Sequence, residues 1–121
     1  MDVKVVNLEE KFEKIKELHS YKVITQMNNY YFKLVRMQRE FIWHQHPETD
    51  EVFIVIDGNL TIELKDKTLH LKKLEMVTIP KGVEYKPSCN KECRLLLIEP
   101  TDTVNTGNVR SNLTDTKLEW I

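Results

Sequence analysis

Apolar and polar residues follow two different spacings along the chain. In "LEEKFEKIKEL", Leu8, Phe12, Ile15 and Leu18 recur at the spacing of one helix face, with Glu and Lys residues between them. This pattern predicts one amphipathic helix over residues 8–19 that buries a single apolar stripe. After residue 20 the pattern changes to short apolar runs that are separated by turn-forming residues.

These runs are rich in Val, Ile, Leu, Tyr and Phe, and they predict strands at 21–27, 30–37, 51–56, 59–65, 67–72, 76–79 and 93–99. Seven or eight short strands after one helix indicate a single all-β domain, either a sandwich or a small barrel. Asp57-Gly58 predicts a hairpin between two of the strands. The run "VFIVI" at 52–56 is apolar on both faces, so we expect a second sheet or another subunit to cover it.

The composition narrows the function classes. The 121 residues are 40% hydrophobic and 31% charged, with a formal net charge of −1, which argues against a nucleic-acid or anionic-membrane surface. There is no apolar run near the roughly 20 residues of a membrane span and no signal-like start, so we expect a cytoplasmic protein. Cys89 and Cys93 have neither redox nor zinc spacing, which predicts two idle or structural thiols.

The stretch "WHQHPETDE" holds the candidate chemistry. His44 and His46 would point to the same face of an extended segment, and Glu51 begins an otherwise apolar strand face with Phe53 and Val55. A buried carboxylate needs compensation, and two imidazoles with one carboxylate suit Fe, Mn, Ni, Co or Zn. The alternative is a polar loop that carries histidines by chance.

The spacing H-x-H-x4-E-x6-G, from His44 to Gly58, resembles the first motif of the cupin superfamily. The second motif is matched in "LEMVTIPKGVEY" at 74–85 by Pro80 and Gly82. The resemblance covers residues 30–99 and extends to small single-domain cupins of the type-2 conserved-barrel, mannose-6-phosphate-isomerase-like group. It implies one domain over 1–121, an all-β double-stranded β-helix (jelly-roll barrel) with one short N-terminal helix. The tail, 101–121, would pack on the barrel or on a partner.

The resemblance also implies metal ligands at His44, His46 and Glu51, with the fourth ligand position at Tyr85, where the family has a histidine. Three interpretations of Tyr85 are open. It ligates a metal as phenolate; it donates a hydrogen bond or a proton beside a three-ligand metal; or the metal is lost and these residues form a polar pocket floor.

Two functions follow as hypotheses. One is a metal-dependent enzyme of the isomerase, epimerase, lyase or oxygenase type, acting on a small sugar, sugar acid or organic acid. The other is a non-catalytic module that binds a small molecule. Lys33 and Arg36 lie on opposite faces of one predicted strand, so at most one faces inward, where it would suit a phosphate or carboxylate. We also expect a homodimer, because the apolar surface exceeds what one small sandwich covers.

Overall fold

The protein is described by a computed structural model that covers residues 2–121. One helix and eight strands follow in order: α1 (Leu8–Glu13), β1 (Lys22–Met27), β2 (Tyr30–Glu40), β3 (Glu51–Asp57), β4 (Leu60–Leu64), β5 (Thr68–Leu71), β6 (Met76–Ile79), β7 (Tyr85–Pro100) and β8 (Glu119–Trp120). The all-β fold with one short helix is confirmed. Across residues 2–121, α1 is the only helix, and it is too short to span a membrane.

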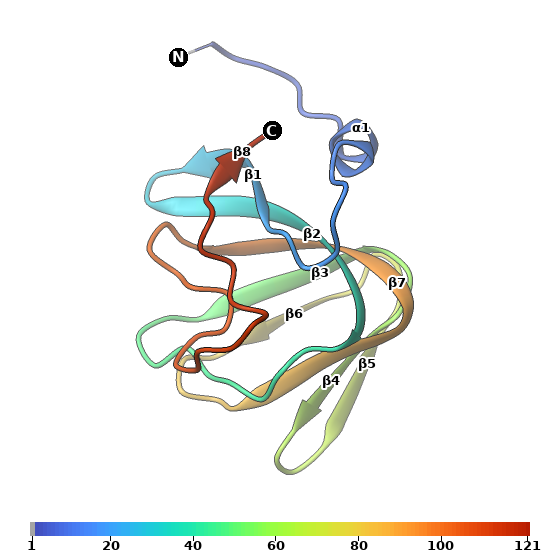
Figure 1. The fold of residues 1–121 in the computed structure, drawn as a ribbon, viewed down its shortest axis with the longest axis vertical. Coiled ribbons are helices and arrows are strands. Elements are labelled where there is room, and N and C mark those ends of the chain that lie inside the picture. Colours follow the sequence, from blue (N-terminus) through green and yellow to red (C-terminus); the bar gives the residue numbers. More distant parts are fainter. Residues whose placement is uncertain (1) are drawn as a thin grey trace.

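The long strand β7 organises the barrel (Figure 1). Along most of its length it pairs antiparallel with β2, from Tyr30–Pro100 to Glu40–Ser88. On its other side, the first part of β7 pairs with β4 and the last part pairs with β3, which also pairs with β6. The strands therefore curl around one interior rather than forming a flat sheet.

Two apolar clusters lie on the two sides of the strands. The interior cluster includes Val35, Met37, Phe53, Val55, Leu95 and Leu97. The outer cluster is formed by Phe12 and Ile15, which pack against the sheet residues Ile24, Leu34, Leu96, Ile54 and Ile56. The outer face of the run "VFIVI" is thus covered in part by the N-terminal helix region, and not by a second sheet.

The helix is shorter than the sequence predicts, because α1 ends at Glu13 and not at residue 19. The Lys14 and Ile15 amides donate to the carbonyls three residues earlier, which tightens the last turn. The chain then leaves the helix, and His19, at a positive φ of 59°, donates its amide to the Arg36 carbonyl at 2.8 Å. The segment that was predicted to form the last helical turns instead packs against β2.

The hairpin predicted at Asp57-Gly58 is wrong. β3 and β4 are consecutive, but they pair with different parts of β7 and not with each other. Gly58 has a φ of +90°, and a Cβ there would lie 2.9 Å from the Cys93 Cβ. The glycine therefore lets the chain cross closely over β7.

The prediction of two idle or structural thiols is also wrong, because Cys89 and Cys93 form a disulfide. In a regular strand, residues four apart are about 13 Å apart. Here the register shifts so that Met37 faces Cys93 while Arg39 faces Cys89, and the bulge brings the two Cα atoms to 6.3 Å. Spacing alone does not reveal a bulge, so the thiols looked separate.

The tail, residues 101–121, lies along the open side of the barrel and ends in β8, which pairs parallel with β1 (Figure 1). Asn105 holds two parts of the tail together, because its side chain donates to the Leu113 carbonyl at 2.9 Å and accepts from the Asp115 amide at 2.8 Å. Asp115 in turn accepts from the Tyr21 amide at 2.9 Å. The tail is therefore part of the wall around the interior.

Candidate metal and small-molecule site

The histidine segment is held by the second motif. His44 and Tyr85 form a two-residue bridge, with amide-to-carbonyl distances of 3.0 and 2.9 Å in the two directions. The Gly82 amide donates to the His46 carbonyl at 3.0 Å. His44 Nδ1 lies 2.9 Å from the Ile42 carbonyl oxygen, which leaves Nε2 free for another partner. Both imidazoles are buried, and their ring centres are 5.2 Å apart.

Glu51 meets His46 and Tyr85 inside the barrel. Glu51 is the first residue of β3 and is buried on the face that carries Phe53 and Val55. Its Oε2 lies 2.8 Å from His46 Nε2, and the Tyr85 hydroxyl donates to its Oε1 at 3.4 Å. Despite the short distance, His46 Nε2 and Glu51 Oε2 make no hydrogen bond, and both atoms are buried. Two such unpartnered atoms side by side require an explanation.

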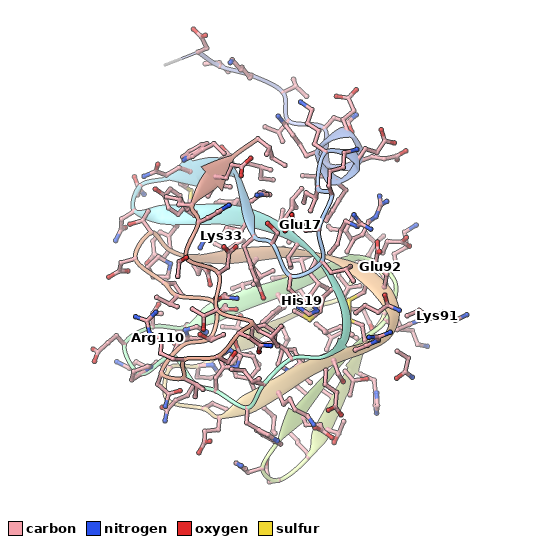
Figure 2. The ribbon with its side chains drawn as sticks, in the orientation of Figure 1. Glu17, His19, Lys33, Lys91, Glu92 and Arg110 are labelled. Atoms are coloured by element: carbon pink, nitrogen blue, oxygen red, sulfur yellow. A yellow bond between two sulfur atoms is a disulfide. The ribbon has the colours of Figure 1, made fainter. Side chains whose placement is uncertain are left out.

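The inward cation is Lys33. It is buried on the face of β2 that also carries Val35 and Met37, and its Nζ lies 2.8 Å from Glu99 Oε1. Arg36 lies on the outer face, where it donates to both carboxylate oxygens of Glu92 at 2.8 and 2.9 Å. Figure 2 shows Lys33 and Glu92 well apart on the barrel.

Glu99 is a site residue that the sequence analysis missed. In the antiparallel pair of β3 and β7, Val52 lies opposite Ile98, so the next residues along the two strands, Glu51 and Glu99, are neighbours. Glu99 is 1% exposed. The available signal was the alternation Leu95, Leu97, Glu99, which ends an apolar face with a carboxylate. Glu51 shows the same feature at the start of its strand, where a carboxylate precedes the apolar Phe53 and Val55 on one face.

Burial sets the protonation of these groups. It lowers the pKa of His44 to about 4 and lowers the pKa of His46, so both imidazoles are neutral at pH 7, the form that binds metals. Burial raises the pKa of Glu51 to about 7, and burial together with the Glu51 charge raises the pKa of Glu99 to about 8. The carboxyl pair together holds at least one proton at neutral pH.

The buried carboxyl pair predicts that stability falls with rising pH. Their usual pKa is 4.5, so above that value the folded protein holds protons that the unfolded chain releases, and this stabilisation is lost as the pH rises through 7 and 8. His44 acts in the opposite direction, but only between about pH 4 and 6.5. We expect the free energy of unfolding, measured with urea, to fall by about 2–3 kcal/mol from pH 6.5 to 8.5.

The Glu99→Gln variant should lose about half of this pH slope, whereas Glu84→Gln, at an exposed carboxylate, should keep it. A wild-type protein whose unfolding free energy is constant over this range would contradict the assignment of a proton to the pair.

The donor atoms fit a metal in part. Two ligands at right angles, each about 2.1 Å from one ion, are about 3 Å apart, close to the 2.8 Å between His46 Nε2 and Glu51 Oε2. His44 lies beside them with a free ring nitrogen. However, among residues 2–121 no group of three or more His, Cys, Asp or Glu side chains is arranged to hold a metal ion. The structure thus brings His44, His46, Glu51 and Tyr85 close together, with the His44 ring centre 5.2 Å from that of His46 and 4.4 Å from that of Tyr85.

Two pockets of the described residues share the strap formed by residues 102–104 as part of their lining. The first, which we call the His46 groove, has a volume of about 450 Å³ and is lined by His46, Tyr30, Glu48 and Gly107 among others. The second, the tail cavity, has a volume of about 310 Å³ and is lined by Tyr21, Lys33, Arg110, Asp115 and Lys117 among others. Both volumes suit a small metabolite.

Comparison with known proteins places these features in a family. The sequence profile of the Cupin domain family matches residues 33–99. The protein named "Uncharacterized protein YdbB" from Bacillus subtilis (strain 168) is 38% identical over 84 residues, which are 69% of this chain and 74% of that protein.

Two solved structures have a similar fold. A cupin-2 domain containing protein from Shewanella frigidimarina NCIMB 400 has a TM-score of 0.78 and 48% identity, over 79% of this chain and 94% of that one. Protein NMB1881 from Neisseria meningitidis has a TM-score of 0.74 and 28% identity, over 80% of this chain and 99% of that one. With the profile match over most of the barrel and the shared fold, the chain belongs to the cupin family.

Proposed function

We propose that this cupin binds a divalent transition metal through His46 and Glu51, with His44 as a third ligand, and uses it to bind a small oxygen-rich molecule. The observation that supports this most directly is the pair of buried atoms His46 Nε2 and Glu51 Oε2. They lie 2.8 Å apart, and neither has a hydrogen-bond partner. Neutral imidazoles and a carboxylate suit Fe, Mn, Ni, Co or Zn. The buried Glu51 charge would then be compensated by the ion.

Several residues of the chain have defined tasks in this proposal. A bound metal would supply Lewis-acid polarisation of a carbonyl or hydroxyl oxygen. Tyr85, fully buried with a pKa well above its usual value because of burial, stays protonated and donates to Glu51 Oε1. Glu51 and Glu99 hold a proton close to the ligand space that the His46 groove opens to. This suits isomerase, epimerase or lyase chemistry on a small sugar, sugar acid or organic acid, and oxygenase chemistry fits equally well if the metal is Fe(II).

Metal binding by the wild-type protein is the first test. Protein purified without chelator or a metal-affinity tag is dialysed against each of Mn, Co, Ni and Zn, and anaerobically against Fe(II), and the bound metal is measured by elemental analysis. We expect close to one equivalent of at least one metal. If none of the five binds, the metal proposal is wrong.

A metal-free binding module is the second candidate, and the Lys33–Glu99 pair favours it. The Lys33 ammonium is 2.8 Å from Glu99 and supplies a positive charge inside the barrel. Together with the proton held by the carboxyl pair, it balances the interior charges without a metal ion. Of the three positions at which the family has histidines, this chain has histidines at two, His44 and His46, and a tyrosine, Tyr85, at the third.

The Tyr85→His variant distinguishes the roles of Tyr85. Tyr85 has its ring centre 4.4 Å from that of His44 and its hydroxyl 3.4 Å from Glu51, so a histidine there would add a nitrogen ligand near the proposed metal. We expect metal affinity to rise by about tenfold or more, which corresponds to about 1.4 kcal/mol. The measurement is competition with a fluorescent metal chelator.

The matched control is Tyr85→Phe, which removes the hydroxyl and keeps the ring. If Tyr85 only donates a hydrogen bond to Glu51, the affinity should fall by about 10- to 100-fold, as for other residues that support a metal ligand. Complete loss of metal in Tyr85→Phe would instead show direct ligation by the phenolate.

The homodimer, the cytoplasmic location and the mannose-6-phosphate-isomerase-like subgroup stay predictions. In support of the homodimer, Val3 and Val5 in the N-terminal segment are almost fully exposed, and Leu118 and Trp120 are more than half exposed. Light scattering at micromolar concentration tests the oligomeric state, and a monomer would contradict it.

A further inference from the structure

The tail cavity lies beside the metal site but has a different chemistry. Its volume is about 310 Å³, and its wall is made by the tail together with Tyr21 and Lys33 from the barrel. His44, His46 and Glu51 do not line it. In Figure 2, Lys33 and Arg110 both lie on the side of the barrel that the tail crosses. A cavity so placed provides a binding space whose walls carry no proposed metal ligand.

Lys33 gives this cavity a buried cation. Its side chain is 7% exposed, and its Nζ contacts Glu99 Oε1. An ammonium has three N–H donors, and Glu99 Oε1, although 2.8 Å away, makes no hydrogen bond with it, so donors remain for a molecule in the cavity. The Thr103 hydroxyl also lines the cavity, and it is buried without a hydrogen-bond partner. A buried ammonium and an unpaired hydroxyl among the residues that line one cavity are suited to receive an anion's oxygen atoms.

The charges around the cavity favour a singly charged carboxylate group over a doubly charged phosphate. Lys33, Arg110 and Lys117 face Asp102 and Asp115, a net excess of one positive charge. Asp115 is already engaged, because its two oxygens accept from the Tyr21 and Lys117 amides at 2.9 and 3.0 Å. The neighbouring Glu51–Glu99 pair keeps at most one negative charge at neutral pH, and this charge disfavours a doubly charged phosphate more than a carboxylate. Arg110 is exposed and can pair with a carboxylate at the rim.

We propose that the tail cavity binds a small organic carboxylate, with one carboxylate group between Lys33 and Thr103 and the rest of the molecule extending toward Arg110. This site does not require a metal. A dicarboxylate of about four carbons fits the volume, and the strap over residues 102–104 brings it next to the His46 groove.

The test uses succinate as the probe, with neutral succinamide and inorganic phosphate as comparison ligands. The full chain is first stripped of metal with 1,10-phenanthroline, an uncharged chelator, and desalted. Binding is measured by calorimetry and by amide chemical shifts. We expect saturable succinate binding that shifts the Thr103 and Asn105 amides, no binding of succinamide, and weaker binding of phosphate. Because the protein is metal-free, a failure of the metal proposal does not affect this result.

Variants locate the site. Arg110→Ala, at an exposed position, should fold normally and weaken succinate binding by about threefold to tenfold. The double variant Lys33→Met/Glu99→Gln removes both charges of the buried pair, and it should weaken succinate binding by more than about tenfold. Lys91→Ala, an exposed cation on the bulge of β7, should bind like wild type (Figure 2). Equal binding of succinate and succinamide, phosphate binding in place of succinate, or unchanged succinate binding in Arg110→Ala would each overturn the proposal.

Discussion

Replacing Lys33 with methionine is expected to lower the free energy of unfolding by about 3 kcal/mol at pH 8.5 and by only about 1 kcal/mol at pH 5.5. Methionine fills a similar volume, so the loss is one of charge. At pH 8.5 the Glu51–Glu99 pair is ionising, and without the ammonium 2.8 Å away the Glu99 carboxylate is buried with no counter-charge. At pH 5.5 both carboxyls are protonated, and little is lost. Urea unfolding at the two pH values measures the difference.

The double variant Lys33→Met/Glu99→Gln separates charge from packing. The amide of glutamine is neutral, so the double variant should recover most of the stability at pH 8.5 and should show a weaker pH dependence than Lys33→Met. Lys22→Met is the matched control, because its ammonium contacts Glu119 at 2.8 Å on an exposed surface. Surface pairs contribute about 0–1 kcal/mol. If Lys33→Met costs as little as Lys22→Met at pH 8.5, the buried ion pair is not a stability determinant.

The strand pattern was predictable because it depends on local alternation, whereas the pairing of the strands was not. Six of the predicted runs match β1 to β6 closely, but the prediction for β7 began at residue 93 and missed its first half. Residues 85–92 contain a proline and a bulge, which break the alternation. Asp57-Gly58 was read as a hairpin because a local signal cannot show that Gly58 is needed to pass Cys93.

The site was predictable only where motif and alternation agreed. His46, Glu51 and Tyr85 were identified, and they lie together. The sequence did not determine which cation faces the interior, because two-residue alternation places Lys33 and Arg36 on opposite faces without indicating which face is inside. Glu99 was missed because it lies about fifty residues from Glu51 in the chain, and only the pairing of β3 with β7 brings the two carboxyls together.

His46→Ala and Glu51→Gln are each expected to lower the affinity for divalent metal by about 100-fold or more, which is about 2.7 kcal/mol. Each variant removes one of the two donor atoms that lie 2.8 Å apart without a hydrogen bond. The controls are His70→Ala and Glu84→Gln, which remove an exposed imidazole and an exposed carboxylate and should bind like wild type. Unchanged affinity in His46→Ala would refute the ligand assignment, whatever the other variants show.

In Glu51→Gln, stability and metal binding should change in opposite directions. The pKa of Glu51 is raised to about 7 by burial, so its ionised form destabilises the metal-free protein at pH 8, and glutamine removes that cost of about 1 kcal/mol. A variant that unfolds at higher urea than wild type yet no longer binds metal cannot have lost the metal through misfolding. If Glu51→Gln instead binds metal normally, Glu51 is not a metal ligand, and its carboxylate serves only to compensate the charge of Lys33.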